Sequence, residues 1–442
     1  WMKLFEREIK GEFSFVLMEF DHLKSLRKVY AGRDMIGIRP MYYHHPSPES
    51  KQLIFTSEIK GAKHFDNSVR EFPPGNILKF ELMELGGFEL TSKQFDWVYD
   101  VVESKDITEE KILYNIRTAV VNSVRRRLDA DRPIAFLLSG GVDSSLVAAI
   151  GRKILGVPIK TFCCGMPGGT DLKYAKLVAD HIKSHHSEVF FSEKEGVDAL
   201  EDIIYATETW DTTTVRASTG QYMVCKHIGT KTDCKVVLVG EGPDEVRSSY
   251  LFNWYAPNGV ALDDAAKEYV KNIHYFDCRR GDRCISYWGL EGRVPLLDPE
   301  VIEAYWQIPA EWRHPKYKGV EKWWLRKAFD GTGLLPDEVL WRKKEAFSDG
   351  VSSKEKSWYE IIQDRCRETI SDEMLSNAKR EWPHMTPETK ESYYFRKVFT
   401  DNFGKHRHDI LPHYWLPKWD RTGKEVDGYV DPSARTLQIY DD

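Results

Sequence analysis

One seven-residue run constrains the fold of this chain more than any other stretch: Ser139-Gly140-Gly141-Val142-Asp143-Ser144-Ser145. An apolar run, 134–138, precedes it, and a run of helix-forming residues, 146–150, follows it. This order predicts a buried strand, a tight glycine turn and the start of a helix. Glycine lets the backbone approach a ligand closely, and the first N–H groups of a helix have no partner within the helix. The run therefore predicts an anion-binding cradle.

The carboxylate of Asp143 is the unexpected member of this run, because it would repel an anion held by the hydroxyls of Ser139, Ser144 and Ser145. A cation between the carboxylate and the anion removes the conflict, and Mg²⁺ bridges carboxylates and phosphate oxygens in many proteins. We therefore interpret the run as a phosphate site with a magnesium ligand. The alternative is a plain strand–turn–helix in which serine and aspartate cap the helix.

The amino-acid composition and the net charge limit the classes of protein to which this chain can belong. The chain has 442 residues, of which 41% are hydrophobic and 30% charged, and its net charge is −6. These values are typical of a globular protein long enough for two domains. No apolar run reaches the roughly 18 residues of a membrane span, and the negative charge gives no reason to expect nucleic acid or a membrane as a partner. The seven cysteines show no metal-ligand spacing, which indicates a reducing, cytoplasmic compartment.

Strand-like and helix-like segments alternate after the amino-terminal quarter of the chain. Apolar runs over 159–164, 185–191 and 235–239 predict buried strands, and helical patterns over 107–128 and 171–184 separate or precede them. Alternation of this kind predicts an α/β fold with a doubly wound, mostly parallel sheet. Ligands of such sheets bind outside the carboxyl ends of the strands. We therefore expect the cradle and the loops after residues 164 and 239 to share one cleft.

An acidic turn, Gly240-Glu241-Gly242-Pro243-Asp244-Glu245, follows the predicted strand 235–239. Three carboxylates this close repel one another unless a cation or a proton relieves them. We predict that Asp244 shares Mg²⁺ with Asp143, and that Glu241 is a general base. The alternative is a solvated acidic turn.

Two further motifs carry candidate binding groups. Thr214, Arg216 and Ser218 combine hydroxyls with a guanidinium, which can bind a carboxylate through two hydrogen bonds. The alternative for this motif is a helix cap beside a surface arginine. Lys343 and Lys344 put cations beside a glycine-ended loop, for which the alternative is a basic surface turn.

Six ordered motifs extend this picture over most of the chain: L-L-S-G-G-x-D-S-S at 137–145, G-x-P-G-x-x-D-L at 165–172, E-T-x-D-x-T-T-x-R-A-S-T at 208–219, G-E-G-x-D-E at 240–245, E-x-R-V-P-x-L-D at 291–298 and K-E-x-F-S-D-G-V at 344–351. The first resembles the pyrophosphate loop of the ATP pyrophosphatases. Together the motifs resemble glutamine-dependent asparagine synthetase, and the tail over 414–419 and 431–436 looks like the eukaryotic-type members of that family.

The amino-terminal quarter resembles the back half of a class II glutamine amidotransferase domain. It carries G-x-F-S-F, G-R-D-x-x-G-x-x-P-x-Y, F-x-S-E-x-K and E-F-P-P-G in that order. We expect a partial domain of the α+β N-terminal-nucleophile type over 1–85, a linker over 86–106 and the synthetase domain over 107–442. The family's glutaminase uses an N-terminal cysteine, whereas residue 1 here is Trp and the first cysteine is Cys163. We therefore expect no glutaminase nucleophile in this chain, and ammonia as its nitrogen source.

The resemblance implies a ligase that joins aspartate and nitrogen from glutamine or ammonia through a β-aspartyl-AMP intermediate, with ATP and Mg²⁺ as cofactors. It admits a homodimer and implies neither nucleic acid nor membrane as a partner. By the family's pattern, Glu241 helps to deprotonate ammonia and Lys344 stabilises the charge of the intermediate. The other residues implied are, for aspartate, Thr214, Arg216 and Ser218; for Mg²⁺, Asp143 and Asp244; for ATP and pyrophosphate, Leu138, Ser139, Gly140, Gly141, Asp143, Ser144, Ser145, Cys164, Val239 and Gly240.

Two positions depart from the family's pattern. Val239 stands where the family usually has Ser, and Val246-Arg247-Ser248-Ser249-Tyr250 stands where it usually has V-F-G-G-Y. Replacement of two glycines predicts an altered loop and a less efficient synthetase. Two other functions stay open at this point: a β-lactam-synthetase-like adenylating enzyme, and a non-catalytic relative that binds ATP.

Overall fold

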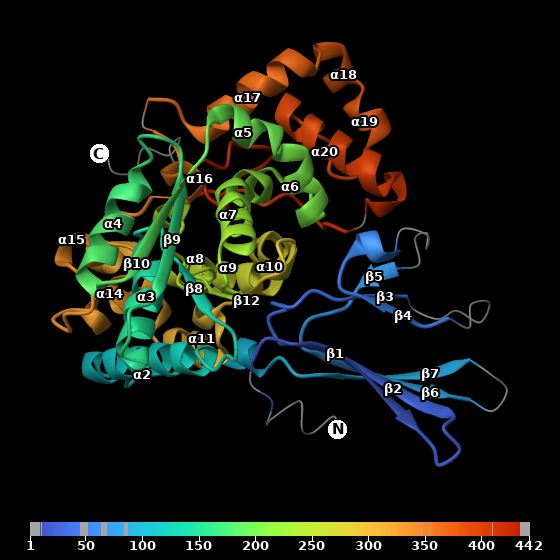
Figure 1. Ribbon diagram of the computed structural model, residues 1–442, viewed down its shortest axis with the longest axis horizontal. Coiled ribbons are helices and arrows are strands. Elements are labelled where there is room, and N and C mark those ends of the chain that lie inside the picture. Colours follow the sequence, from blue (N-terminus) through green and yellow to red (C-terminus); the bar gives the residue numbers. More distant parts are fainter. Residues whose placement is uncertain are drawn as a thin grey trace.

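The computed structural model describes residues 9, 11–44, 52–62, 69–83, 87–345, 347–353, 355–408 and 410–433. Its central element is a five-stranded sheet in the order β10-β9-β8-β11-β12 (Figure 1). The strands of this sheet are β8 (Ile134–Leu137), β9 (Lys160–Gly165), β10 (His185–Phe190), β11 (Val236–Leu238) and β12 (Glu291–Arg293).

All neighbouring strands of this sheet are parallel. The chain runs outward through β8, β9 and β10, then returns to place β11 on the other side of β8. The strand order therefore reverses between β8 and β11, and such a switch point is where doubly wound sheets open a ligand crevice. The predicted doubly wound parallel sheet is confirmed, and the cradle and the acidic turn follow the two strands at its switch point.

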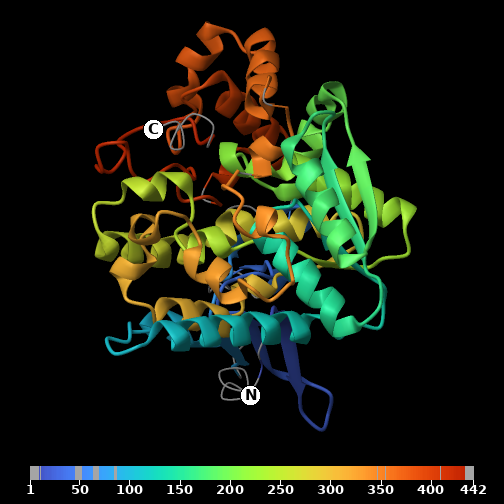
Figure 2. The same ribbon diagram turned by 90° about the vertical axis from the view of Figure 1, so that its left-hand side faces the viewer.

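The long helix α2 (Glu109–Arg127) shows how the sequence pattern produces the packing. Thr108 caps its first turn by accepting a hydrogen bond from the backbone N–H of Lys111. Its apolar residues recur at helical spacing and are buried, among them Ile112, Ile116 and Val120. Figure 2 shows α2 as a long teal helix along one edge of the molecule. It packs against α3, α11 and α14, and so supports the helix that begins at the cradle.

The remaining helices surround the sheet. From the cradle onward they are α3 (Val142–Leu155), α4 (Thr170–Ile182), α5 (Glu193–Asp198), α6 (Leu200–Thr207), α7 (Thr212–Lys231), α8 (Pro243–Val246), α9 (Gly259–Asn272), α10 (Asp277–Ser286) and α11 (Pro299–Trp306). Toward the carboxyl end follow α12 (Ala310–Arg313), α13 (Pro315–Lys318), α14 (Trp323–Phe329), α15 (Asp337–Leu340), α16 (Phe347–Gly350), α17 (Trp358–Thr369), α18 (Asp372–Ser376), α19 (Ala378–Glu381) and α20 (Lys390–Phe403). Short 3-10 turns lie at Ile59–Ala62, Trp97–Asp100, Leu251–Tyr255, Ile273–Tyr275, Pro295–Leu297 and Lys405–Arg407. No helix in the described ranges is long and apolar enough to cross a membrane.

Two smaller antiparallel sheets form the amino-terminal part, drawn in blue beside the main sheet in Figure 1. One has the order β1-β2-β6-β7 and the other β4-β3-β5. Their strands are β1 (Ser14–Phe20), β2 (Leu26–Arg33), β3 (Tyr42–His44), β4 (Ile54–Thr56), β5 (Val69–Glu71), β6 (Asn76–Leu82) and β7 (Phe88–Gln94).

The segment 86–106, which the sequence analysis predicts as a linker, contains regular structure. Strand β7 lies within it and pairs with β6 over seven residues, from Asn76↔Gln94 to Leu82↔Phe88. A short 3-10 turn, Trp97–Asp100, follows the strand. The sequence analysis does not predict this strand, because its residues are mixed in polarity. The strand is stabilised by its pairing with β6.

The G-R-D motif ties the loops of the amino-terminal part together. Asp34 is buried, and one of its carboxylate oxygens accepts hydrogen bonds from the backbone N–H groups of Ile36, Gly37 and Ile38. The guanidinium of Arg33 donates to the carbonyls of Arg39, Phe72 and Gly37 and to the carboxylate of Glu71. These bonds satisfy buried backbone groups that would otherwise be costly.

Buried charges also join this part to the main sheet. Glu208, which is fully buried, accepts hydrogen bonds from the backbone N–H groups of Ile59 and Lys60, both at 3.0 Å. Arg283 lies 3.4 Å from the same carboxylate, and Arg279 lies 3.0 Å from Glu71. Removing one partner of such a network leaves the other charge buried and unpaired. The amino-terminal part is therefore fixed against the end of α6 and against α10, and α10 forms part of the wall of the site.

Candidate active site

A cavity of about 240 Å³ opens at the switch point between β8 and β11. Its lining comes from the cradle, the end of β9, the first turns of α7, the acidic turn, α10 and the segment 342–345. Segments more than 200 residues apart in sequence meet here, as expected for the carboxyl edge of a doubly wound sheet. The cradle and the loop after residue 239 share the cleft as expected, whereas β9 contributes its last residues and not the loop that follows it.

The cradle has the local structure that its glycines and serines predict. Gly140 has a φ of +76°, and a Cβ there would lie 2.6 Å from the backbone N of Ala175, so only glycine fits. The Ser144 hydroxyl accepts a hydrogen bond from the backbone N–H of Ser139 at 3.2 Å and lies 3.1 Å from the Ser139 hydroxyl. Helix α3 begins at Val142, so its unpaired N–H groups face the cavity end of the sheet.

The acidic turn packs directly against the cradle. A Cβ at Gly240 would lie 2.7 Å from the backbone N of Ser144 and 2.9 Å from its Cα. Gly242 has a φ of +93°, and a Cβ there would lie 2.2 Å from Leu297. The two glycines thus let the loop after β11 touch the start of α3, which brings the carboxylates of Asp143 and Asp244 to one side of the cavity.

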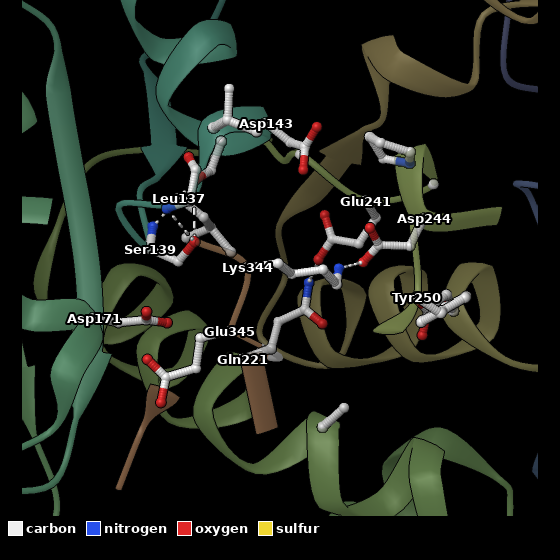
Figure 3. Close-up of a pocket in the computed structure, with 18 of the residues that line it drawn as sticks. Leu137, Ser139, Asp143, Asp171, Gln221, Glu241, Asp244, Tyr250, Lys344 and Glu345 are labelled. Atoms are coloured by element: carbon white, nitrogen blue, oxygen red, sulfur yellow. Dashed lines mark hydrogen bonds and ion pairs between the residues drawn. The ribbon is translucent and has the colours of Figure 1, made fainter. Parts of the chain in front are cut away.

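Two lysines neutralise these carboxylates. The Nζ of Lys322 donates to Asp143 and lies 2.7 Å from Asp244, and the Nζ of Lys344 donates to the other oxygen of Asp244. Figure 3 shows Lys344 pointing at Asp244, with Glu241 beside them. All four groups of this charge cluster, Asp143, Asp244, Lys322 and Lys344, line the cavity.

The pKa shifts follow from this pairing. Burial acts to raise the pKa of Asp244, but Lys322 and Lys344 outweigh it and hold that pKa well below its usual range. Burial acts to lower the pKa of Lys322, but Asp143 and Asp244 raise it above its usual value. For Lys344 burial is the stronger effect, and its pKa is lowered. Asp244 and Lys322 therefore stay charged at neutral pH.

The cluster also has the chemistry of a magnesium site completed by substrate. One ammonium nitrogen contacts both Asp143 and Asp244, so the two carboxylates converge on a single point. Mg²⁺ takes one or two protein carboxylates and fills its remaining positions with phosphate oxygens and water. No group of three or more His, Cys, Asp or Glu side chains in the described ranges could hold a metal. Asp143 and Asp244 fit a metal that arrives with its phosphates.

Glu241 lies at the inner side of the cavity, where fewer positive charges surround it than surround Asp244. Gln221 donates a hydrogen bond to its Oε1 at 3.0 Å, and Arg280 lies 3.4 Å from the same oxygen. The other oxygen, Oε2, is buried and has no hydrogen-bond partner among the described residues. Burial raises the pKa of Glu241, against the attraction of Arg280. A carboxylate with one unpaired oxygen and a raised pKa is suited to accept a proton.

Most of the predicted ATP-site residues line the cavity. They are Leu138, Ser139, Gly141, Asp143, Ser144, Cys164 and Gly240, and the predicted catalytic residues Glu241 and Lys344 line it too. Gly140, Ser145 and Val239 do not: Gly140 shapes the turn, while Ser145 and Val239 are buried behind it. Val239 donates its backbone N–H to the carbonyl of Arg293, so this N–H is already paired within the protein.

The residues predicted to bind aspartate do not line this cavity. Thr214, Arg216 and Ser218 are buried away from the cavity, and the cavity-facing residues of α7 are Thr213, Ala217, Gln221 and Val224. Arg216 binds Glu391 through two hydrogen bonds of 2.7 and 2.6 Å, and Asp431 through two more. Its guanidinium is thus already paired with carboxylates of this chain, and a substrate carboxylate would have to replace Asp431 to reach it.

The loop after the acidic turn, residues 246–250, is hydrogen-bonded to Asp244. Ser248 takes a left-handed φ of 50°, where the family has glycine. Ser249 donates its hydroxyl to the carboxylate of Asp244 at 2.6 Å, and its backbone N–H to the Asp244 carbonyl. Ser248 thus takes a backbone conformation that favours glycine, and Ser249 fixes the loop to Asp244.

Sequence reasoning missed several lining residues, chiefly Lys322, Gln221, Arg280 and Arg342. Lys322 lies 179 residues from Asp143 and has a left-handed φ of 58° just before α14. Neither property is visible in the sequence. A spacing of four residues relates Thr213, Ala217 and Gln221, and this helical spacing was the one signal that could have pointed to Gln221.

Comparisons with known proteins agree with this geometry. The sequence matches the asparagine synthase family over residues 115–269 and 256–422, and a glutamine amidotransferase domain over residues 1–64. It is 39% identical to asparagine synthetase (glutamine-hydrolyzing) of Gallus gallus over 456 residues, which cover 98% of this chain and 78% of that protein. The Homo sapiens protein of the same description is 39% identical over 454 residues, with the same coverage. This chain belongs to the asparagine synthase family.

One solved structure adds little. NMN synthetase from Francisella tularensis covers 67% of this chain and 96% of its own, with 12% identity and a TM-score of 0.29. A similarity at that level carries no argument about the site.

The contact between Gly240 and Ser144 leads to a test of the site. We predict that Gly240→Ala forces the acidic turn away from the cradle and weakens ATP binding about tenfold, because overpacking at such a contact costs about 1–3 kcal/mol. Isothermal titration calorimetry with Mg–ATP measures this. The matched control is Gly281→Ala in α10, where a Cβ meets nothing within 4 Å. Equal ATP affinity of the two variants would show that the cradle and the turn are not one site.

Proposed function

We propose that this chain catalyses the ATP-dependent amidation of aspartate to asparagine, with release of AMP and pyrophosphate. The observation that carries the proposal is the meeting of an anion cradle and a lysine-neutralised acidic turn in one cavity. Family membership agrees with it, since the relatives are glutamine-hydrolyzing asparagine synthetases. The nitrogen comes from ammonia, or from glutamine where a complete amidotransferase domain is present.

In the first step a side-chain carboxylate oxygen of aspartate attacks the α-phosphorus of ATP, and the bond to pyrophosphate breaks. Ser139, Ser144 and the N–H groups at the start of α3 hold the departing pyrophosphate. Lys322 and Lys344 supply positive charge to the phosphate oxygens, which stabilises the charge that develops on the leaving group. Asp143 and Asp244 would hold Mg²⁺, which would supply further positive charge to the phosphates.

In the second step ammonia attacks the acyl carbon of β-aspartyl-AMP, and AMP leaves. The attacking nitrogen must lose a proton, and Glu241 accepts it through the oxygen that has no hydrogen bond. Gln221 and Arg280 fix the other oxygen and so orient the carboxylate. Lys344 stabilises the negative charge of the tetrahedral intermediate from the far side of Asp244.

The aspartate substrate occupies the space between the phosphate site and α7. Its backbone groups face Thr213 and Gln221, which line the cavity. Arg216 and its neighbours Thr214 and Ser218 enter this site only if the tail residue Asp431 gives up Arg216. When the substrate carboxylate replaces Asp431 in this way, Arg216 binds aspartate as predicted.

The proposal also includes the cellular compartment in which the protein acts. All seven cysteines are free and buried, and burial raises the pKa of Cys163 to about 12, so its thiol resists oxidation. These thiols support a reducing compartment, the cytoplasm. The domain boundaries near residues 85 and 107, and a homodimer, remain predictions.

The product balance tests the function as a whole. We predict that the chain, given ATP, Mg²⁺, aspartate and ammonium, forms asparagine, AMP and pyrophosphate in equal amounts. The reason is that the cradle lies where the β and γ phosphates leave together. Chromatography of nucleotides with amino-acid analysis measures the three products. ADP and phosphate in their place would contradict the proposal, as would AMP that forms without aspartate.

The role of Glu241 has its own test. We predict that Glu241→Gln lowers asparagine formation by a factor on the order of 10²–10⁴, as expected for a general base. Aspartate-dependent exchange of labelled pyrophosphate into ATP should persist, because adenylation does not need that proton transfer. Glu188→Gln on β10, an exposed carboxylate, is the control. Equal losses in both reactions would assign Glu241 to binding rather than to the second step.

A further inference from the structure

Arg247 is a buried cation without hydrogen bonds. Its side chain has no exposed surface, and Nε, NH1 and NH2 all lack a hydrogen-bond partner among the described residues. Its guanidinium lies 5.7 Å from the ring of Tyr305, a cation–π contact. A guanidinium has five N–H donors, and burying them without acceptors is costly. We therefore expect the Arg247 guanidinium to pair with a nearby anion.

That partner is the free oxygen of Asp143. NH1 of Arg247 lies 3.5 Å from Oδ1 of Asp143, and this oxygen also lacks a hydrogen bond. A shift of roughly half an ångström would bring the two atoms into hydrogen-bond range. Donor and acceptor are thus both unsatisfied and almost in contact.

The other oxygen of Asp143 is held from the cavity side. Lys322, which lines the cavity, donates to Oδ2, while Arg247 approaches from the protein interior and does not line it. Asp143 therefore has two cationic partners, of which only Lys322 can reach a bound phosphate. When Lys322 turns to the phosphate, Asp143 needs the second partner, because an unpaired buried carboxylate is expensive.

We propose that Arg247 is a positioning residue that pairs with Asp143 when Lys322 binds pyrophosphate, so that the cradle also holds pyrophosphate when no divalent cation is bound at Asp143 and Asp244. The inference rests on the proposed function and deepens it at the same site. The same positive charge beside Asp143 opposes the approach of a metal ion. Arg247 thus strengthens metal-free pyrophosphate binding and weakens metal binding at Asp143.

Opposite shifts in two affinities test this role. Isothermal titration calorimetry measures inorganic pyrophosphate binding in EDTA, and Mn²⁺ binding to the free protein is measured by electron paramagnetic resonance. We expect Arg247→Met to weaken metal-free pyrophosphate binding about tenfold and to tighten Mn²⁺ binding about tenfold, the effect of one nearby charge. A merely structural role would weaken both. We expect Arg247→Lys, which keeps the charge, to stay within about threefold of the unchanged chain in both titrations.

A matched control separates this effect from the loss of any buried arginine. Arg396 is also buried, its Nε and NH1 also lack hydrogen bonds, and it stacks on Trp210 at 3.6 Å, outside the cavity lining. Arg396→Met should leave both affinities unchanged. Unchanged pyrophosphate affinity in Arg247→Met, or weaker Mn²⁺ binding, would overturn the inference. If Arg247→Met does not fold, a loss of tenfold or more in Arg247→Lys overturns it. Product formation by the unchanged chain tests the proposed function separately.

Discussion

The ammonium group of Lys322 contacts carboxylates from two different loops, one after β8 and one after β11. Without a cation at this point, Asp143 and Asp244 would repel each other across the switch point of the sheet. With it, the cradle and the acidic turn lie in contact through Gly240 and Ser144. The affinity for phosphate, the place for a metal ion and the orientation of Lys344 all depend on this one bridged pair. Charge pairing of this kind is strong because the groups are buried.

The charges in and around this cluster suit one cavity to two proposed steps, one of which needs positive charge and the other a base. In the proposed mechanism, adenylation needs positive charge at the leaving pyrophosphate, which Lys322 and Lys344 supply. Amide formation needs a base, and Glu241 is paired with Gln221 and Arg280 rather than with a lysine. Burial without a lysine partner raises its pKa, whereas the lysines depress that of Asp244. Neighbouring carboxylates of one turn thus acquire different roles from their surroundings.

The parts of the site that the sequence predicts are those with local causes. The cradle and the acidic turn depend on glycines and helix starts within a few residues, and both form as expected. Lys322 could not be predicted, because its partners are distant in the sequence and its backbone conformation is set by the loop before α14. Arg216 and Ser218 do not line the cavity, because Arg216 pairs with Glu391 and Asp431 and the Ser218 hydroxyl donates to the carbonyl of Thr214. Long-range pairing of this kind is not visible in the sequence, and the role of these residues in aspartate binding stays a prediction. Strand β7 was missed because its pairing with β6 outweighs its own mixed pattern.

Transfer of oxygen from aspartate to AMP tests the central claim, that the cluster serves attack by aspartate on the α-phosphorus. Aspartate labelled with ¹⁸O in its side-chain carboxylate is converted with ATP and ammonium, and the products are analysed by mass spectrometry. The account predicts one labelled oxygen in each AMP and none in pyrophosphate. Label in inorganic phosphate, or AMP without label, would contradict it.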